Sequence, residues 1–107
     1  MMNITDLTTK YGFEKFKHTH HITYRRTISE NLIMSIAIGD FIYSRPRNHT
    51  AKVYEAVEIM FQDAKGAPTY PSTLLGSQFK NHFDGQIFPY FPTEDLKTFL
   101  AMIATKN

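Results

Sequence analysis

Residues 16–38 read FKHTHHITYRRTISENLIMSIAI, and this stretch decides the fold. Residues 16–28 are rich in aromatic and β-branched side chains and contain neither Gly nor Pro, a composition typical of a strand. Residues 29–31, Ser-Glu-Asn, favour a turn. Residues 32–38 are apolar except for Ser35, as expected for a strand that is buried on both faces. The stretch therefore predicts an antiparallel hairpin.

Residues 41–43, Phe-Ile-Tyr, follow this hairpin after Gly39. An isolated glycine in a strand pattern often marks a bulge, so we expect residues 41–43 to continue the second strand. Residues 44–50, SRPRNHT, then form a polar loop, because Pro46 has no backbone N–H to donate to a sheet.

Residues 52–61, KVYEAVEIMF, fit two structures, because some of their apolar side chains recur at helical spacing and others alternate as in a strand. The following QDAKGAP is typical of a hairpin turn, which favours a strand over residues 54–61. We expect residues 69–84 to be irregular, with one helical turn near Leu74. Residues 87–90 predict a short strand, which Pro89 restricts to the edge of a sheet.

Helices are predicted at the two ends of the chain. Residues 4–11 form a short helix that Asn3 or Thr5 can cap and Gly12 can end. Residues 93–105 form a longer helix with two acidic residues in its first turn. Four of its side chains make one apolar stripe that should close one face of the sheet: Leu96, Phe99, Leu100 and Ile103.

The sequence thus predicts a single α+β domain over residues 1–107. Its antiparallel sheet has three to five strands, with the C-terminal helix packed on one face and a short helix at the N-terminus. The chain contains no Cys, which excludes disulfides and thiolate-based metal sites. No apolar run approaches the roughly 18 residues that a membrane span needs. No secretion signal is recognisable either, so we expect a cytoplasmic protein without a membrane partner.

Positive charge is concentrated in the first half of the chain. Residues 1–52 contain eight Lys and Arg against four Asp and Glu, whereas residues 53–107 contain four against six. If the fold keeps the first half on one side, that side can attract phosphate or an acidic protein surface. Ordinary scatter of surface charge explains the imbalance equally well.

The histidines raise two catalytic hypotheses. His18 and His20 would share one face of a strand, but a zinc site needs a third ligand that only tertiary contacts with His49, Asp40 or His82 could supply. We therefore expect no bound metal and no cofactor.

The segment from His21 to Thr23 has the form His-x-Thr, one half of the paired motif of two-histidine phosphoesterases. The sequence contains no second copy of this motif. It also lacks a nucleophile elbow, a Walker loop and a zincin motif, so an enzyme is the minority interpretation.

Cations alternate with aromatic residues along the first half of the chain. Guanidinium groups bind phosphate or carboxylate, and aromatic rings can stack on bases. In the simpler interpretation, the rings belong to the core and the cations to its rim. The candidate binding residues are Tyr24, Arg25, Arg26, Tyr43, Arg45, Arg47, His49 and Lys52.

Three segments carry a family resemblance: LIMSIAIGDFIYSRPR, YEAVEIMF with the turn QDAKG, and IFPYFPTEDLKTFLAMI. Over residues 32–103 the chain resembles a family of small accessory proteins encoded by bacteriophages and prophages. That family has no assigned chemistry, so the resemblance implies a phage accessory origin and no residue-level role. Small phage proteins of this kind often resemble inhibitors of host defence, including anti-CRISPR and anti-restriction proteins, which act by occupying a surface.

The leading hypothesis is a phage-type binding protein that blocks a nucleic-acid-associated defence machine of the host through its basic surface. The expected partner is a host protein or nucleoprotein complex. The second hypothesis is a nucleotide-sequestering protein, in which aromatic rings stack on a base and arginines hold phosphate. The third is a small phosphodiesterase built on His21 and Thr23. The sequence does not fix the oligomeric state and leaves a homodimer open.

Overall fold

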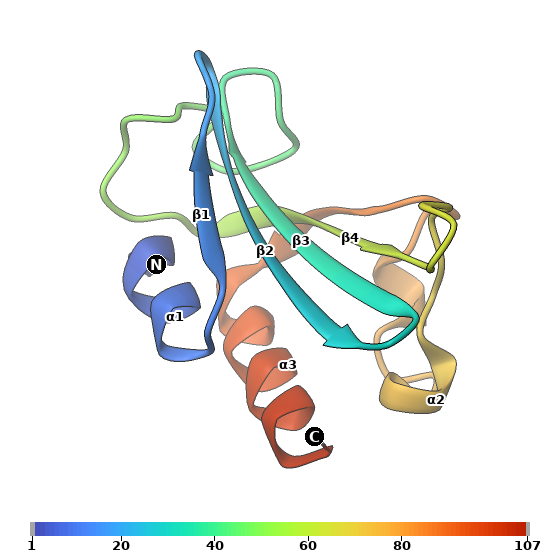
Figure 1. Cartoon of the computed structure of the whole chain (residues 1–107). Coiled ribbons are helices and arrows are strands. Elements are labelled where there is room, and N and C mark those ends of the chain that lie inside the picture. Colours follow the sequence, from blue (N-terminus) through green and yellow to red (C-terminus); the bar gives the residue numbers. More distant parts are fainter. Residues whose placement is uncertain (1, 107) are drawn as a thin grey trace.

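Five antiparallel strands form one sheet, and they lie side by side in the order in which they occur along the chain (Figure 1). The structure is a computed structural model that describes residues 2–106. Together with the helices, the sheet makes an α+β fold, as the sequence predicts. The elements are α1 (Ile4–Lys10), β1 (Glu14–Lys17), β2 (His21–Ser29), β3 (Leu32–Gly39), β4 (Ala56–Gln62), α2 (Ser72–Leu75), the 3-10 helix η1 (Lys80–His82), β5 (Phe88–Pro92) and α3 (Thr93–Lys106).

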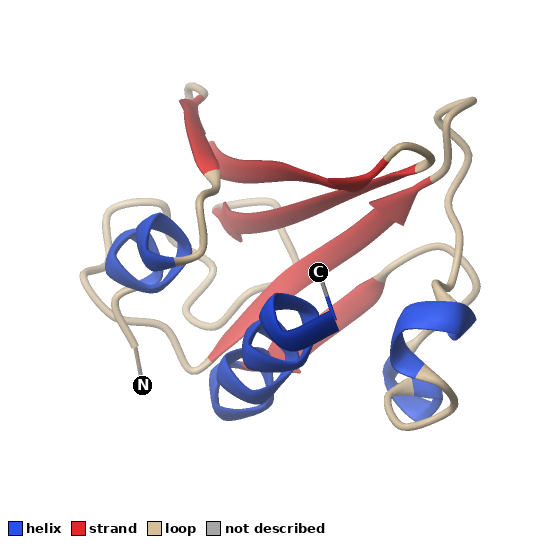
Figure 2. Cartoon of the chain, turned by 60° about the horizontal axis from the view of Figure 1, so that its bottom comes forward, coloured by secondary structure: helices blue, strands red, loops and turns tan. Residues whose placement is uncertain are grey.

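The helices gather on one side of the sheet (Figure 2). The predicted apolar stripe of α3 is confirmed, since Leu96, Phe99, Leu100 and Ile103 are all buried. The ring of Phe99 lies among the rings of Phe61, Phe79, Phe88 and Phe91, which join the sheet to α3 and to the segment before β5. Within residues 2–106, no helix combines the length and the apolar character needed to cross a bilayer.

The predicted strand over residues 16–28 is two strands, and the expectation of one continuous strand is wrong. β1 and β2 pair antiparallel around residues 18–20, where the backbone N–H of His18 donates to the carbonyl of His21 at 2.9 Å. This turn contains neither Gly nor Pro, so the composition of the stretch gave no sign of it. The hairpin of β2 and β3, with its turn after Ser29, is confirmed.

β3 ends at Gly39, and the expected continuation over residues 41–43 is wrong. A Cβ at Gly39 would lie 2.5 Å from the Cβ of His21 and 2.6 Å from the carbonyl oxygen of His20, so only glycine fits against β2 here. The backbone N–H of Asp40 donates to the carbonyl oxygen of His20 at 2.9 Å. The chain then leaves the sheet and forms a long loop that leads to β4.

The second half of the chain follows the prediction more closely. Residues 56–62 form a strand, which decides the helix-or-strand ambiguity, and the turn after it is closed by Asp63, whose carboxylate accepts from two backbone N–H groups. The helical turn near Leu74 is α2, within an otherwise irregular segment. β5 pairs only with β4 among the described strands and so forms the predicted edge.

Candidate functional site

A cleft opens on the inner side of the sheet at the β1 edge, because two inward positions of β1 carry lysines. Lys15 lies opposite Tyr24 and Lys17 opposite Ile22, and residues opposite each other in a sheet point to the same face. Tyr24 and Ile22 are core residues. Long charged side chains do not complete a dry core, so the β1 edge of the inner face stays open to solvent.

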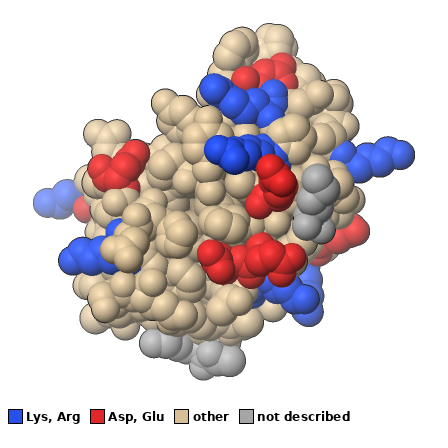
Figure 3. All heavy atoms as spheres, turned by 180° about the vertical axis from the view of Figure 1, so that it is seen from behind, with Lys and Arg blue, Asp and Glu red and all other residues tan. Residues whose placement is uncertain are grey.

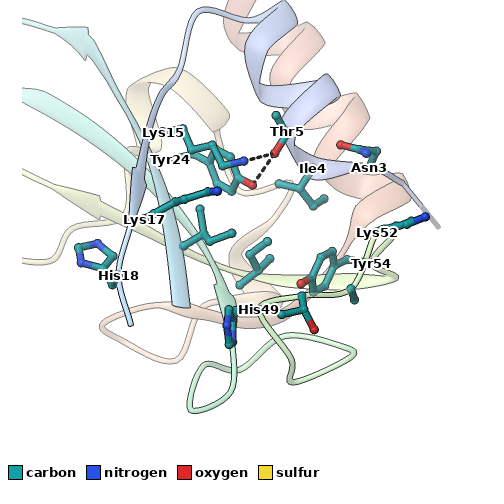
Figure 4. Close-up of a pocket in the computed structure, with 14 residues that line it drawn as sticks. Asn3, Ile4, Thr5, Lys15, Lys17, His18, Tyr24, His49, Lys52 and Tyr54 are labelled. Atoms are coloured by element: carbon teal, nitrogen blue, oxygen red, sulfur yellow. Dashed lines mark hydrogen bonds between the residues drawn. The ribbon is translucent and has the colours of Figure 1, made fainter. Parts of the chain in front are cut away.

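The cleft has a volume of about 350 Å³ and is bounded by α1, by β1 and β2, and by the loop segment 49–54 (Figure 4). Lys15 and Lys17 reach in from β1, while Lys52 lies on the opposite wall with its ammonium pointing away from the cleft. The imidazole of His49 also borders the cleft, whereas that of His18 turns away and stacks on the ring of His21. Of the 14 described residues that line the cleft, none is Asp or Glu.

Hydroxyl groups on the cleft walls form a short chain of hydrogen bonds. The ammonium of Lys15 donates to Thr5 Oγ1 at 3.1 Å, and this oxygen lies 2.9 Å from the hydroxyl of Tyr24. The hydroxyl of Tyr54 donates to the carbonyl of Asn48. Burial raises the pKa of both tyrosines, so their hydroxyls stay protonated and neutral at physiological pH.

Asp40 fixes one imidazole of the cleft. Its carboxylate accepts from the backbone N–H of His49 at 3.1 Å and lies 2.9 Å from Nδ1 of the same residue. Nδ1 of His20 lies 3.4 Å from the other carboxylate oxygen. The hydrogen bond from the His49 side chain is the main cause that lowers the pKa of Asp40. His49 is therefore held in place by a group that is not itself part of the cleft lining.

A second group of cations lies outside the cleft, beside β5. The guanidinium carbon of Arg45 lies 4.9 Å from the centroid of the Tyr90 ring, and that of Arg47 lies 5.6 Å from the centroid of Tyr43. The centroids of the Tyr43 and Tyr90 rings lie 5.5 Å apart. We call Tyr43, Arg45, Arg47 and Tyr90 the Arg–Tyr surface.

Several backbone contacts hold the Arg–Tyr surface in position. The backbone N–H of Tyr90 donates to the carbonyl of Tyr43 at 3.0 Å, and Nε of Arg47 donates to the carbonyl of Ile42 at 3.1 Å. The backbone N–H of Arg45 donates to Ala56 at 2.9 Å. Tyr90 has a φ of 49°, the left-handed region that non-glycine residues rarely occupy, and such strain is concentrated at functional positions.

The eight candidate residues from the sequence do not form one surface. Tyr43, Arg45 and Arg47 belong to the Arg–Tyr surface, whereas His49, Lys52 and Tyr24 border the cleft. Arg25 and Arg26 lie apart from both, on β2. The structure therefore divides the predicted basic surface into separate parts.

Two details correct the expectation further. Tyr24 is 1% exposed, so its ring belongs to the core and cannot stack on a base; only its hydroxyl meets the cleft. Arg25 and Arg26 are neighbours on β2 and point to opposite faces of the sheet, because side chains alternate along a strand. On the face of the molecule in Figure 3, basic and acidic side chains are interspersed.

Lys15 and Lys17 belong to the alternation of cations and aromatic residues in the sequence, but they were not included among the candidate binding residues, and neither was Tyr90. The alternation Lys-Phe-Lys over residues 15–17 was the available signal for the two lysines, since it places both on one face of a strand. Their inward direction follows only from the pairing of β1 with β2. For Tyr90 the sequence carried no signal that would place it beside Arg45.

The histidine cluster does not match its predicted arrangement. His18 and His20 lie in the turn between β1 and β2 instead of sharing a strand face. The ring of His18 stacks on that of His21 with centroids 4.2 Å apart, and its Nε2 lies 3.1 Å from Thr23 Oγ1. Burial, followed by the neighbouring His18 and His20, lowers the pKa of His21. In the part of the chain that the structure describes, no group of three or more His, Cys, Asp or Glu is placed to hold a metal ion.

Comparison with protein-family models, with curated proteins and with solved structures finds no match to this chain. The resemblance to phage accessory proteins and the hypotheses drawn from it therefore stay predictions, and the case for a function depends on the geometry above.

Proposed function

We propose that this chain is a binding protein that captures a macromolecular partner through the Arg–Tyr surface. The partner class that we favour is a protein with an acidic patch, alone or within a nucleoprotein complex. Inhibition of a host defence machine is the biological role that the phage resemblance implies. The observation that carries the proposal is the pair of exposed arginines packed on tyrosine rings beside β5.

The arginines of this surface are available for a partner. Among the side chains of residues 2–104, the ion pairs within 4.0 Å join Asp40 to His20 and His49, and none involves Lys or Arg. Stacking on Tyr90 and Tyr43 restricts the guanidinium groups, so less side-chain entropy is lost when a carboxylate binds to them. The edges of the guanidinium groups carry the N–H donors that pair with carboxylates.

Exposed aromatic side chains accompany the arginines. Phe41 is 77% exposed and Tyr43 is 45% exposed, both in the loop that follows β3. Exposure of a phenylalanine ring to water costs free energy, which burial against a partner would recover. Aromatic residues and arginine are also enriched at the centres of protein interfaces. Burial of Phe41 and Tyr43 would add apolar contact to the charge pairing.

Glu55 favours a protein partner over nucleic acid. It lines a cavity beside β5 together with Arg45 and Tyr90, so the surface carries a carboxylate next to one of its cations. A phosphate backbone would be repelled by this carboxylate, whereas a protein partner can offer a matching donor. Weak dependence of binding on salt is therefore expected, in contrast to the steep dependence of nucleic-acid complexes.

Affinity capture from a lysate of the bacterial host tests the proposal. The double variant Arg45→Glu, Arg47→Glu should lose the partner that the wild-type chain captures. The matched control is Lys65→Glu, Lys97→Glu, which changes the net charge equally at exposed positions in the turn after β4 and on α3. Capture by the control and loss by the first variant supports the proposal. Retention of the same partner by both variants contradicts it.

A further inference from the structure

We propose that the cleft bounded by α1, β1 and residues 49–54 binds the phosphate group of a small ligand. This site is separate from the Arg–Tyr surface and does not depend on its function. Three ammonium groups lie around the cleft, those of Lys15, Lys17 and Lys52. Lys15 and Lys17 reach toward the cleft from β1, whereas the ammonium of Lys52, on the far wall, points away from them, so an anion in the cleft can contact the two lysines of β1 (Figure 4).

The cleft holds positive charge that nothing in its walls balances. None of the 14 described lining residues is acidic, and the ion pairs among the side chains of residues 2–104 include none of the three lysines. Like charges that share a cleft repel one another, and low-dielectric walls strengthen this repulsion. A phosphate with one or two negative charges removes the repulsion and gains charge-assisted hydrogen bonds.

Neutral donors are available beside the lysines. Thr5 Oγ1 accepts from Lys15 and shares a hydrogen bond with the hydroxyl of Tyr24. Whichever of the two hydroxyls donates in that bond, the other keeps its hydrogen for an acceptor in the cleft. The protonated state of Tyr24, which burial favours, preserves this donor. Phosphate oxygens accept several hydrogen bonds at once, so mixed ammonium and hydroxyl donors suit them.

The dimensions of the cleft limit the ligand. About 350 Å³ is at the lower end of the range for ligand sites, enough for a phosphate or diphosphate and a small attached group. Stacking of a base on Tyr24 or Tyr54 is excluded, because each residue is only 1% exposed. In this cleft, recognition of the phosphate itself therefore replaces the stacking of an aromatic ring on a base that the sequence hypothesis proposed.

Titration calorimetry with inorganic pyrophosphate tests this site. We expect saturable binding of one pyrophosphate per chain at about 50 mM salt, weakened as added salt screens the charges. Loss of a charge-assisted hydrogen bond costs about tenfold in affinity, so Lys17→Gln should weaken binding about tenfold and Lys15→Gln, Lys17→Gln about a hundredfold. The control Lys65→Gln, Lys97→Gln has the same net charge as that double variant and should bind like the wild type.

Two outcomes would overturn the inference. One is the absence of saturable binding, or an equal loss of affinity in the control double variant, which would mean that pyrophosphate responds to net charge alone. The other concerns the source of the phosphate. A single-stranded oligothymidylate that binds through Lys15 and Lys17 much more tightly than pyrophosphate would assign the cleft to a nucleic-acid backbone. Capture of the macromolecular partner by Lys15→Gln, Lys17→Gln is expected to be unchanged, which separates this test from that of the Arg–Tyr surface.

Discussion

Replacing Phe99 by alanine tests how α3 is joined to the sheet. The ring of Phe99 is fully buried and lies 4.7 Å from the ring of Phe79, 5.3 Å from Phe91, 5.6 Å from Phe61 and 6.0 Å from Phe88, measured between centroids. Truncation of a buried Phe to Ala costs about 3–5 kcal/mol. Because four ring contacts are lost together, we expect a value in the upper half of that range, about 4–5 kcal/mol.

Urea unfolding at 25 °C, followed by far-ultraviolet circular dichroism, measures this loss. A domain of this size has a total stability of about 5–15 kcal/mol, so Phe99→Ala can leave little folded protein. Phe99→Leu keeps most of the apolar volume and should cost about 1 kcal/mol, which remains measurable. Lys97→Ala, at an exposed position of the same helix, should stay within about 0.5 kcal/mol of the wild type. If Phe99→Ala lost less than about 1 kcal/mol, α3 would not pack on the sheet as described.

Three further substitutions test local features. Gly39→Ala should destabilise the fold by at least about 2 kcal/mol in thermal unfolding, because the new Cβ would collide with the backbone of β2; wild-type stability would contradict that close approach. Burial, and then Asp84, raises the pKa of Glu58 above its ordinary 4.5, so wild-type stability should fall as the pH rises through the folded-state pKa. Glu58→Gln should therefore unfold at a higher temperature than the wild type at pH 7 but at the same temperature well below pH 4.5, and equal temperatures at both pH values would refute this. The pKa of Asp40 is lowered from 3.8, so the stability that its ionised form contributes is complete above pH 3.8 and is lost as the pH falls through the lower folded-state value. Asp40→Asn should lower the unfolding temperature near neutral pH. Its unfolding temperature should also fall less steeply than that of the wild type as the pH is lowered below 3.8. An equally steep fall in both proteins would mean that the contact with His49 contributes nothing.

The main elements were predictable where a local signal and the tertiary structure agree. The stripe of α3 and the capping by Asn3 follow from helical periodicity and from side-chain hydrogen bonding alone. The turn at residues 18–20 was not predictable in this way. Its residues are His and Thr, which carry no turn preference comparable with that of Gly or Asn, and the pairing of β1 with β2 stabilises the turn.

The candidate sites depend even more on tertiary contacts. Lys15 and Lys17 became part of a cleft only because β1 pairs with β2 in a register that turns them inward. A shift of one residue would place Phe16 inside and both lysines outside. Tyr24 was misjudged for the same reason, since the sequence places it among cations and the register places it in the core. Arg45 and Arg47 were identified correctly as an exposed pair, but their tyrosine partner Tyr90 comes from a strand more than 40 residues away.

The central claim, capture of a partner by the Arg–Tyr surface, is tested most directly by the dissociation constant of the purified complex. Once the partner is isolated by affinity capture, surface plasmon resonance can compare wild type, Tyr43→Ala, Arg47→Ala and the control Lys65→Ala. Truncation of an interface hot spot costs at least about 2 kcal/mol, so Tyr43→Ala and Arg47→Ala should each raise the dissociation constant about 30-fold or more. Lys65→Ala should change it less than about twofold, as surface positions outside an interface do. Dissociation constants within about threefold of the wild type for both Tyr43→Ala and Arg47→Ala would contradict the account.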